Sequence, residues 1–272
     1  MGVSRSGYYT WKNEYKAREQ REQEQEDLVL RVHSQGEGHY GAARIAGIIR
    51  RDGGSIATYK VRDIMKKYNL SCSHHKRRQK SLTDSRKSRD DSYKNLTQDI
   101  IINKPMQVLS SDITYIRTGE GFDYLCQVKD VVTGVIVGYC QQDKMTKDIV
   151  LKALNNAYNS GLISGAPIFH SDRGSQYTAR EVKEYIKNLG WKQSFSAVGK
   201  PGDNSWSESF FANLKKEIVH WKHFKTREEA RQAIFDYIER YYNRVRVQER
   251  LNYLSPMEYL KNDSKEILKS VA

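Results

Sequence analysis

The hydrophobic and polar positions in the first part of the chain recur with the period of an α-helix. Residues 14–31 are densely charged and contain neither Gly nor Pro, which predicts a helix that is exposed along most of its length. Within residues 42–70, apolar residues keep helical spacing in two short segments separated by Gly53 and Gly54. Such a pair is typical of a helix-turn-helix, and an ordinary helical hairpin has the same pattern. The sequence therefore predicts a small helical domain over residues 1–70, whose role the pattern alone leaves open.

From Gln107 onward the pattern changes to that of strands. Three consecutive strands are predicted by the β-branched and aromatic segments VLSSDITYIRTG, FDYLCQVKDVV and GVIVGYCQQ. A helix, a short strand and a second helix are predicted by TKDIVLKALNNAYNSG, APIFHSD and AREVKEYIKNLG. With a further strand and helix, the order becomes three strands, helix, strand, helix, strand, helix. This order predicts a mixed α/β sheet with helices on both faces.

The length of the chain allows two domains, and its composition gives it a basic net charge. A chain of 272 residues is long enough for two domains. Lys and Arg number 46 against 33 Asp and Glu, and the net charge of +13 favours a phosphate backbone or an anionic membrane surface as partner. No apolar run approaches the roughly 20 residues of a membrane span, and no apolar secretory signal opens the chain. These two observations predict a soluble intracellular protein. The three cysteines have no CxxC spacing, so we expect their thiols to be reduced.

The two predicted domains are joined by a basic segment. Residues 71–95 almost lack apolar residues and are rich in Lys, Arg and Ser, a composition that cannot bury a core. Lys76, Arg77 and Arg78 in this segment are candidate contacts with a DNA backbone. The predicted domains are a helical domain over 1–70, a basic linker over 71–104, an α/β core over 105–224 and a helical tail over 225–272.

Three carboxylates occupy positions that suggest a site. Asp112 lies within a strand, where Asp is depleted, and Asp172 lies at the carboxyl end of a strand, where ligand sites of open α/β sheets gather. A helical wheel predicts a core face formed by Trp206, Phe210, Phe211, Leu214, Ile218 and Trp221. Glu208 lies at the border of this face, with Lys215 two turns further along the same stripe. Each carboxylate also has a structural explanation, as an edge-strand charge, a turn residue or part of a capping box, respectively.

A shared site would explain all three carboxylates at once. Carboxylates that are brought together raise one another's pKa values, so their arrangement is unfavourable unless cations are present. Hard oxygen ligands without Cys or His suit Mg²⁺ or Mn²⁺, and two such ions roughly 4 Å apart can clamp the attacking and leaving oxygens of a phosphodiester. The sequence therefore predicts that acidic residues hold metal while the basic surface holds DNA. Arg246, which follows a predicted helix end, is a further candidate for backbone contact.

These residues resemble the acidic triad of a known family. Asp112 in SDITYI, Asp172 in HSDRGSQYT and Glu208 in GKPGDNSWSESFFANLKKE match the DDE transposases of insertion sequences, specifically the second-frame product related to retroviral integrases. Thirty-five residues separate Asp172 from Glu208, the interval for which that group is named. The resemblance covers nearly the whole chain, since GVSRSGYYTWK, HYGAARI and YYNRVRVQERLNYLSPMEYL also resemble segments of the family.

The resemblance implies a ribonuclease-H-like catalytic core and a metal-dependent reaction. Asp112, Asp172 and Glu208 would carry two Mg²⁺ or Mn²⁺ ions for DNA cleavage and strand transfer, and Lys215 would contact the DNA end. The expected partners are the terminal inverted repeats, target DNA, a second copy of the chain and an upstream-frame product or fusion. The expected location is the cytoplasm, in association with the nucleoid. A catalytically silent DNA-binding relative and a nuclease on the same fold remain as alternatives.

Overall fold

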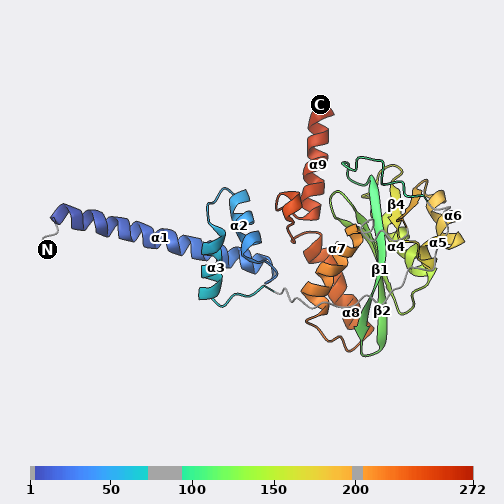
Figure 1. The fold of residues 1–272 in the computed structure, drawn as a ribbon, viewed down its shortest axis with the longest axis horizontal. Coiled ribbons are helices and arrows are strands. Elements are labelled where there is room, and N and C mark those ends of the chain that lie inside the picture. The colour runs from blue at the N-terminus through green and yellow to red at the C-terminus, as the bar shows by residue number, and fades with distance from the viewer. Residues whose placement is uncertain (1–3, 73–93, 198–204, 272) are drawn as a thin grey trace. The chain divides into compact units, whose positions relative to one another are not determined.

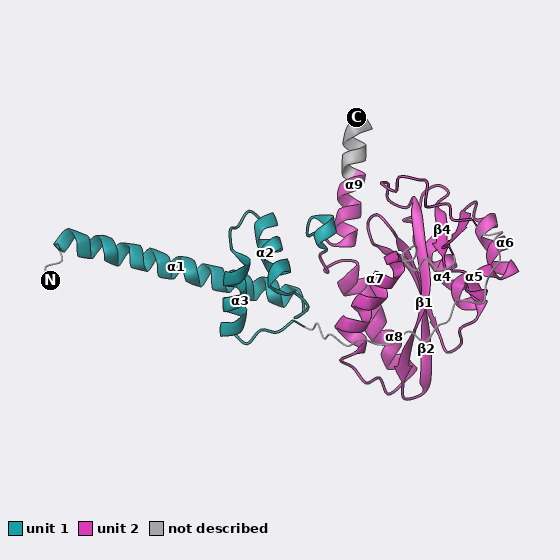
Figure 2. Ribbon diagram, viewed as in Figure 1, with its two compact units in different colours: residues 1–74, 248–253 teal, residues 75–247, 254–272 magenta. Residues whose placement is uncertain are grey.

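The computed structural model describes residues 4–72, 94–197 and 205–271, which belong to two compact units (Figures 1 and 2). The first unit contains residues 1–74 and 248–253, and the second contains residues 75–247 and 254–272. Among the described residues, no helix combines the length and apolar character that crossing a membrane requires.

The first unit is helical. Its helices are α1 (Arg5–Gln35), α2 (Ala42–Arg51), α3 (Thr58–Lys67) and the 3₁₀ turn η4 (Glu249–Leu251). Ser4 caps α1 by accepting a hydrogen bond from the backbone N–H of Gly7 at 3.1 Å. Only Val29 and Val32 of α1 are buried, which confirms the prediction of an exposed helix. A salt bridge of 2.6 Å from Lys67 to Glu26 ties the end of α3 to α1.

The second unit is built on a five-stranded sheet. Its elements are β1 (Val108–Thr118), β2 (Gly121–Asp130), β3 (Ile136–Gln142), α4 (Lys147–Asn159), β4 (Ile168–Ser171), α5 (Ser175–Thr178), α6 (Arg180–Asn188), β5 (Lys192–Phe195), α7 (Ser205–Leu214), η2 (Lys215–Val219), α8 (Arg227–Phe235), η3 (Asp236–Tyr242) and α9 (Pro256–Val271). The strand order is β3-β2-β1-β4-β5. The first three strands pair antiparallel, whereas β4 pairs parallel with both β1 and β5. The predicted order of strands and helices is confirmed.

The two faces of the sheet carry different helices (Figure 2). Helices α4, α5 and α6 cover one face, where a continuous core includes Leu109, Val128 and Phe169 from the sheet. Helices α7 and α8 cover the other face, where Ile116 and Leu125 are fully buried. Because side chains alternate along a strand, the residues next to Leu109 and Val128 in the sequence point to the opposite face, toward α7.

Helix α7 changes its winding at Leu214. Phe210, Phe211 and Leu214 are buried as the helical wheel predicts, but Lys215–Val219 forms a π-helical turn. A π turn bonds residue i to i+5, so every later side chain is rotated relative to an α-helix. The prediction that Trp221 lies on the core face is therefore wrong: its side chain is 49% exposed.

Residues predicted as a C-terminal tail complete the second unit. Asn243 bonds both backbone groups of Ile136 in β3, at 3.0 and 3.1 Å. Arg231 of α8 forms a 2.8 Å salt bridge with the buried Asp123 of β2. Helices α8 and η3 thus pack on the sheet as part of its unit. The end of the predicted linker also reaches the sheet, because the backbone N–H of Phe195 donates to the backbone carbonyl of Lys94 at 3.1 Å.

Candidate functional site

The pairing of β1 with β4 brings two of the predicted carboxylates to neighbouring positions. These parallel strands pair Ser110 with His170, and each carboxylate lies two residues beyond its member of that pair. Asp112 continues along β1, whereas Asp172 directly follows the last residue of β4. Neighbouring strands are roughly 4.8 Å apart. Asp112 and Asp172 therefore lie side by side at the point where β4 ends and β1 continues past it.

The charge state of Asp112 reflects its burial and its acidic neighbours. Burial raises the pKa of Asp112, the charge of Asp172 raises it further, and Glu208 adds a smaller effect, to about 7 in total. The backbone N–H of Ile113, 2.8 Å from Asp112 Oδ1, and the charge of Lys215 lower this pKa. Burial also raises the pKa of Asp172, against a hydrogen bond from the Gly174 N–H at 3.0 Å. The carboxylates of Asp172 and Glu208 thus lie close enough to Asp112 for their charges to raise its pKa.

Glu208 lies in the first turn of α7, where the helix dipole favours a negative charge. Its side chain is exposed, but the turn that carries it is anchored from both sides. The buried Lys129 of β2 donates to the carbonyl of Trp206 at 2.6 Å and to Ser209 Oγ at 3.4 Å. The Trp206 ring packs edge-on against His170 of β4, with 5.8 Å between centroids. These contacts hold the start of α7 over the strands that carry Asp112 and Asp172.

Lys215, the first residue of η2 directly after α7, completes the arrangement. Its Nζ lies 5.1 Å from the centroid of the Tyr115 ring, three residues beyond Asp112 on β1. Burial lowers the pKa of Lys215, and the negative charge of Asp112 raises it. The structure therefore brings the predicted lysine beside the carboxylates.

The carboxylates of Asp112, Asp172 and Glu208 suit a divalent cation, although their present positions do not form a complete coordination site. Among the described residues, no three Asp, Glu, His or Cys side chains are close enough to hold a metal ion as they stand. The chemistry nevertheless fits: the ligands are hard carboxylate oxygens, and a cation would offset the repulsion that raises the pKa of Asp112. Glu208 can approach by rotating its exposed side chain.

Arg246 does not lie at this site. Its side chain is buried and makes a bidentate ion pair with Glu217, with Nη2 to Oε1 at 2.8 Å and Nε to Oε2 at 2.9 Å. The hydroxyl of Tyr237 donates to the same carboxylate at 2.8 Å. The predicted contact of Arg246 with DNA is therefore at odds with its position, because the π turn places Glu217 inside the unit as its partner. The other predicted DNA contacts, Lys76, Arg77 and Arg78, lie outside the described residues.

Sequence reasoning missed two polar residues of β2 that lie under the site. Lys129 pairs with Ser110, and Gln127 pairs with Asp112, so both side chains share the face of Asp112. The signal was present in the strand FDYLCQVKDVV, where Gln127 and Lys129 alternate with the apolar residues Cys126 and Val128.

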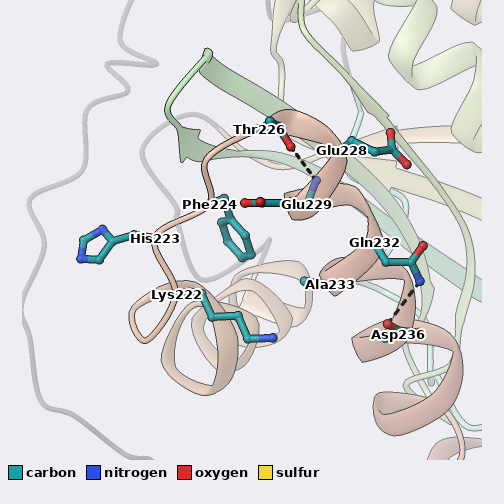
Figure 3. A pocket seen from close by; sticks show the side chains of 9 residues that line it. All are labelled: Lys222, His223, Phe224, Thr226, Glu228, Glu229, Gln232, Ala233 and Asp236. Atoms are coloured by element: carbon teal, nitrogen blue, oxygen red, sulfur yellow. Dashed lines mark hydrogen bonds between the residues drawn. The ribbon is translucent and has the colours of Figure 1, made fainter.

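A pocket elsewhere in the second unit is separate from these residues (Figure 3). It is lined by Lys222, His223, Phe224, Thr226, Glu228, Glu229, Gln232, Ala233 and Asp236. Thr226 Oγ1 accepts from the Glu229 N–H at 3.1 Å, and Glu229 accepts from the Lys225 N–H at 2.6 Å. Two polar side chains of the pocket thus hold the start of α8, where Thr226 is the N-cap.

Three family models match the chain. Integrase core domain models match residues 102–201 and 208–263, and an HTH-like domain model matches residues 20–78. The first and second matches include the three carboxylates, and the third includes α2 and α3. Together with the mixed sheet and its flanking helices, they show a ribonuclease-H-like unit preceded by a helix-turn-helix-like domain, as predicted.

Curated relatives align over most of their length. The "Insertion element IS600 uncharacterized 31 kDa protein" of Shigella sonnei is 35% identical, over 95% of this chain and 95% of the relative. "Transposase for insertion sequence element IS904" of Lactococcus lactis is 35% identical, over 88% and 94%, and "Transposase InsF for insertion sequence IS3A" of Escherichia coli is 32% identical, over 95% and 91%. The HTLV-2 integrase catalytic core domain in complex with magnesium has a TM-score of 0.43 at 17% identity, over 57% of this chain and 96% of that one. The relatives show that the chain belongs to the insertion-sequence transposases.

Proposed function

We propose that this chain is a DDE-type DNA transposase that catalyses metal-dependent DNA cleavage and strand transfer at the ends of an insertion sequence. The observation that supports the proposal is the register of β1 and β4, which brings Asp112 and Asp172 to neighbouring positions, and the charges of Asp172 and Glu208 both raise the pKa of Asp112. A carboxylate with a pKa of about 7 in this position is poorly accommodated without a cation, and perturbed groups of this kind concentrate at functional sites.

The three carboxylates would hold two Mg²⁺ or Mn²⁺ ions. When bound, such ions activate the attacking oxygen and stabilise the leaving oxygen of a phosphodiester. The chain's own part is to hold the ligands on separate rigid elements: Asp112 on β1, Asp172 directly after β4 and Glu208 on α7. Lys129 fixes the start of α7, so that Glu208 stays over the strand ends.

The cations of the chain would hold the DNA. Lys215, placed over the ring of Tyr115 and beside Asp112, would donate to a phosphate of the element end. Lys76, Arg77 and Arg78 would add contacts with the phosphate backbone that do not depend on sequence. We further propose terminal inverted repeats, target DNA, a second copy of the chain and an upstream-frame product as partners, and a nucleoid-associated location in the cytoplasm.

The proposal is tested with a labelled duplex that carries the element end, as identified from the DNA flanking the reading frame. The parent should give cleaved and joined products with Mg²⁺ or Mn²⁺ but not with Ca²⁺. Asp172→Asn should bind the duplex and give neither product. Cleavage without joining in the parent would indicate a nuclease, and binding without either product would indicate a silent DNA-binding relative.

A further inference from the structure

Gln127 lies directly across from Asp112 in the pairing of β1 with β2. Directly opposed residues of antiparallel strands project from the same face, with Cβ atoms about 5 Å apart. The side chain of Gln127 is fully buried on the face that α7 covers, as the contact of its neighbour Lys129 with Trp206 shows. The amide of Gln127 therefore lies within reach of the Asp112 carboxylate and is screened from solvent.

The amide of Gln127 is unusual because it makes no hydrogen bond. Within the described part of the chain, neither Nε2 nor Oε1 has a partner, although both atoms are buried. Burying an unbonded amide is unfavourable, and native proteins pair nearly all such groups. An apolar side chain of the same length, such as Met, would fill this position in the metal-free fold without that cost. The polar group thus points to a bond that forms when something binds next to it.

Asp112 is the group that needs such a bond. One of its oxygens, Oδ1, accepts from the Ile113 N–H at 2.8 Å. An ionised carboxylate offers about four acceptor positions, so a cation and one backbone N–H leave room for another donor. Carboxylates that bind metals are usually held by further hydrogen bonds, which fix their orientation. The side-chain NH₂ group of Gln127 is a donor on the required face.

We infer that Gln127 is a positioning residue for Asp112: its amide donates to the Asp112 carboxylate in the metal-bound state and holds that carboxylate in one orientation. The inference rests on the proposed function, because it assumes that Asp112 binds the cation. Gln127 acts through Asp112 and has no contact of its own with DNA. The side-chain amide of Gln127 therefore contributes to the metal-bound site and not to the stability of the metal-free protein.

The test compares Gln127→Met with Gln193→Met in the full-length chain. Gln193 on β5 is the matched control, because its Nε2 already donates to the Tyr177 carbonyl at 2.9 Å. Two quantities are measured for each protein without DNA: the Tm in the presence of a chelator, followed by near-UV circular dichroism, and the Kd for Mn²⁺, followed by the electron paramagnetic resonance of free Mn²⁺. Gln127→Leu serves as a second variant in case Met packs poorly.

Gln127→Met should keep or raise the metal-free Tm, because the parent has no hydrogen bond there to lose, and should weaken Mn²⁺ binding about tenfold or more. Gln193→Met should lower the Tm and leave the Kd for Mn²⁺ unchanged. An unchanged Kd in Gln127→Met would overturn the inference. So would a weaker Kd accompanied by a lower Tm in both Gln127 variants, since general destabilisation would then explain the weaker binding. If the parent binds Mn²⁺ no better than Asp112→Asn does, the proposed metal site fails as well.

Discussion

Replacing Asp112 by Asn should stabilise the metal-free protein at neutral pH. The fold raises the pKa of this carboxyl from 3.8 to about 7, chiefly by burial and then by the charge of Asp172. Each pH unit of difference corresponds to about 1.4 kcal/mol, so the ionised carboxylate costs the fold up to about 4 kcal/mol. Asn has the same shape and can still accept from the Ile113 N–H, but it carries no charge.

The gain should depend on pH in a defined way. Above pH 7, Asp112 is ionised in the folded and the unfolded chain, so the full cost is present and the variant has its largest advantage. As the pH falls from 7 towards 3.8, the folded chain takes up a proton before the unfolded chain does, and the cost declines. Below 3.8 both states are protonated. The variant should then be no more stable than the parent.

The assay is urea unfolding in the presence of a chelator at pH 8, 6 and 4, followed by tryptophan fluorescence. Asp99→Asn is the control, because Asp99 is an exposed residue of the same unit and its replacement should change the unfolding free energy little. If Asp112→Asn is no more stable than the parent at pH 8, the reasoning is refuted, because the ionised carboxylate then does not destabilise the fold. Added Mn²⁺ should reverse the order by stabilising only the parent.

Three further outcomes are expected. Lys215→Ala should weaken binding of element-end DNA in fluorescence anisotropy while its Tm is retained; Lys152→Ala, an exposed change on α4, should leave binding unaltered. Glu217→Gln should lower the free energy of unfolding by about 3 kcal/mol, because Arg246 stays buried without its counter-charge, whereas Arg240→Met, in an exposed pair, should change it by less than about 1 kcal/mol. Replacing Lys76, Arg77 and Arg78 by Gln should reduce the slope of log affinity against log salt by about 0.9 for each DNA phosphate that these side chains neutralise, and an unchanged slope would show that this segment is only a tether.

The elements of the sheet could be predicted because their signals are local. The β-branched runs of β1 to β3 and the helical spacing of α4 and α6 follow directly from the sequence. Asp112 and Asp172 stood out for a similar reason, since each carboxylate interrupts or ends an apolar strand. That they leave the sheet at the same level depends on the parallel register of β1 and β4, which is a long-range feature.

The features that sequence reasoning missed depend on tertiary packing. The sequence predicts a contact of Arg246 with DNA because Arg246 follows a predicted helix end. Its partner is Glu217, 29 residues earlier, which a π turn rotates into the interior. Gln127 and Lys129 could be recognised as polar positions in an apolar strand, but their roles depend on what lies opposite them: Asp112 for the first and the start of α7 for the second.

The central claim is that Glu208 completes a metal site and does not merely begin a helix. The most direct test measures the rate at which Glu208→Gln joins element ends to target DNA with Mn²⁺, beside Glu184→Gln on the exposed face of α6. Gln retains the size of Glu and can still satisfy a capping box. The account predicts joining at background level for Glu208→Gln, with DNA binding and Tm retained, and the parent rate for Glu184→Gln. Joining at the parent rate by Glu208→Gln would contradict it and leave this residue as a helix cap.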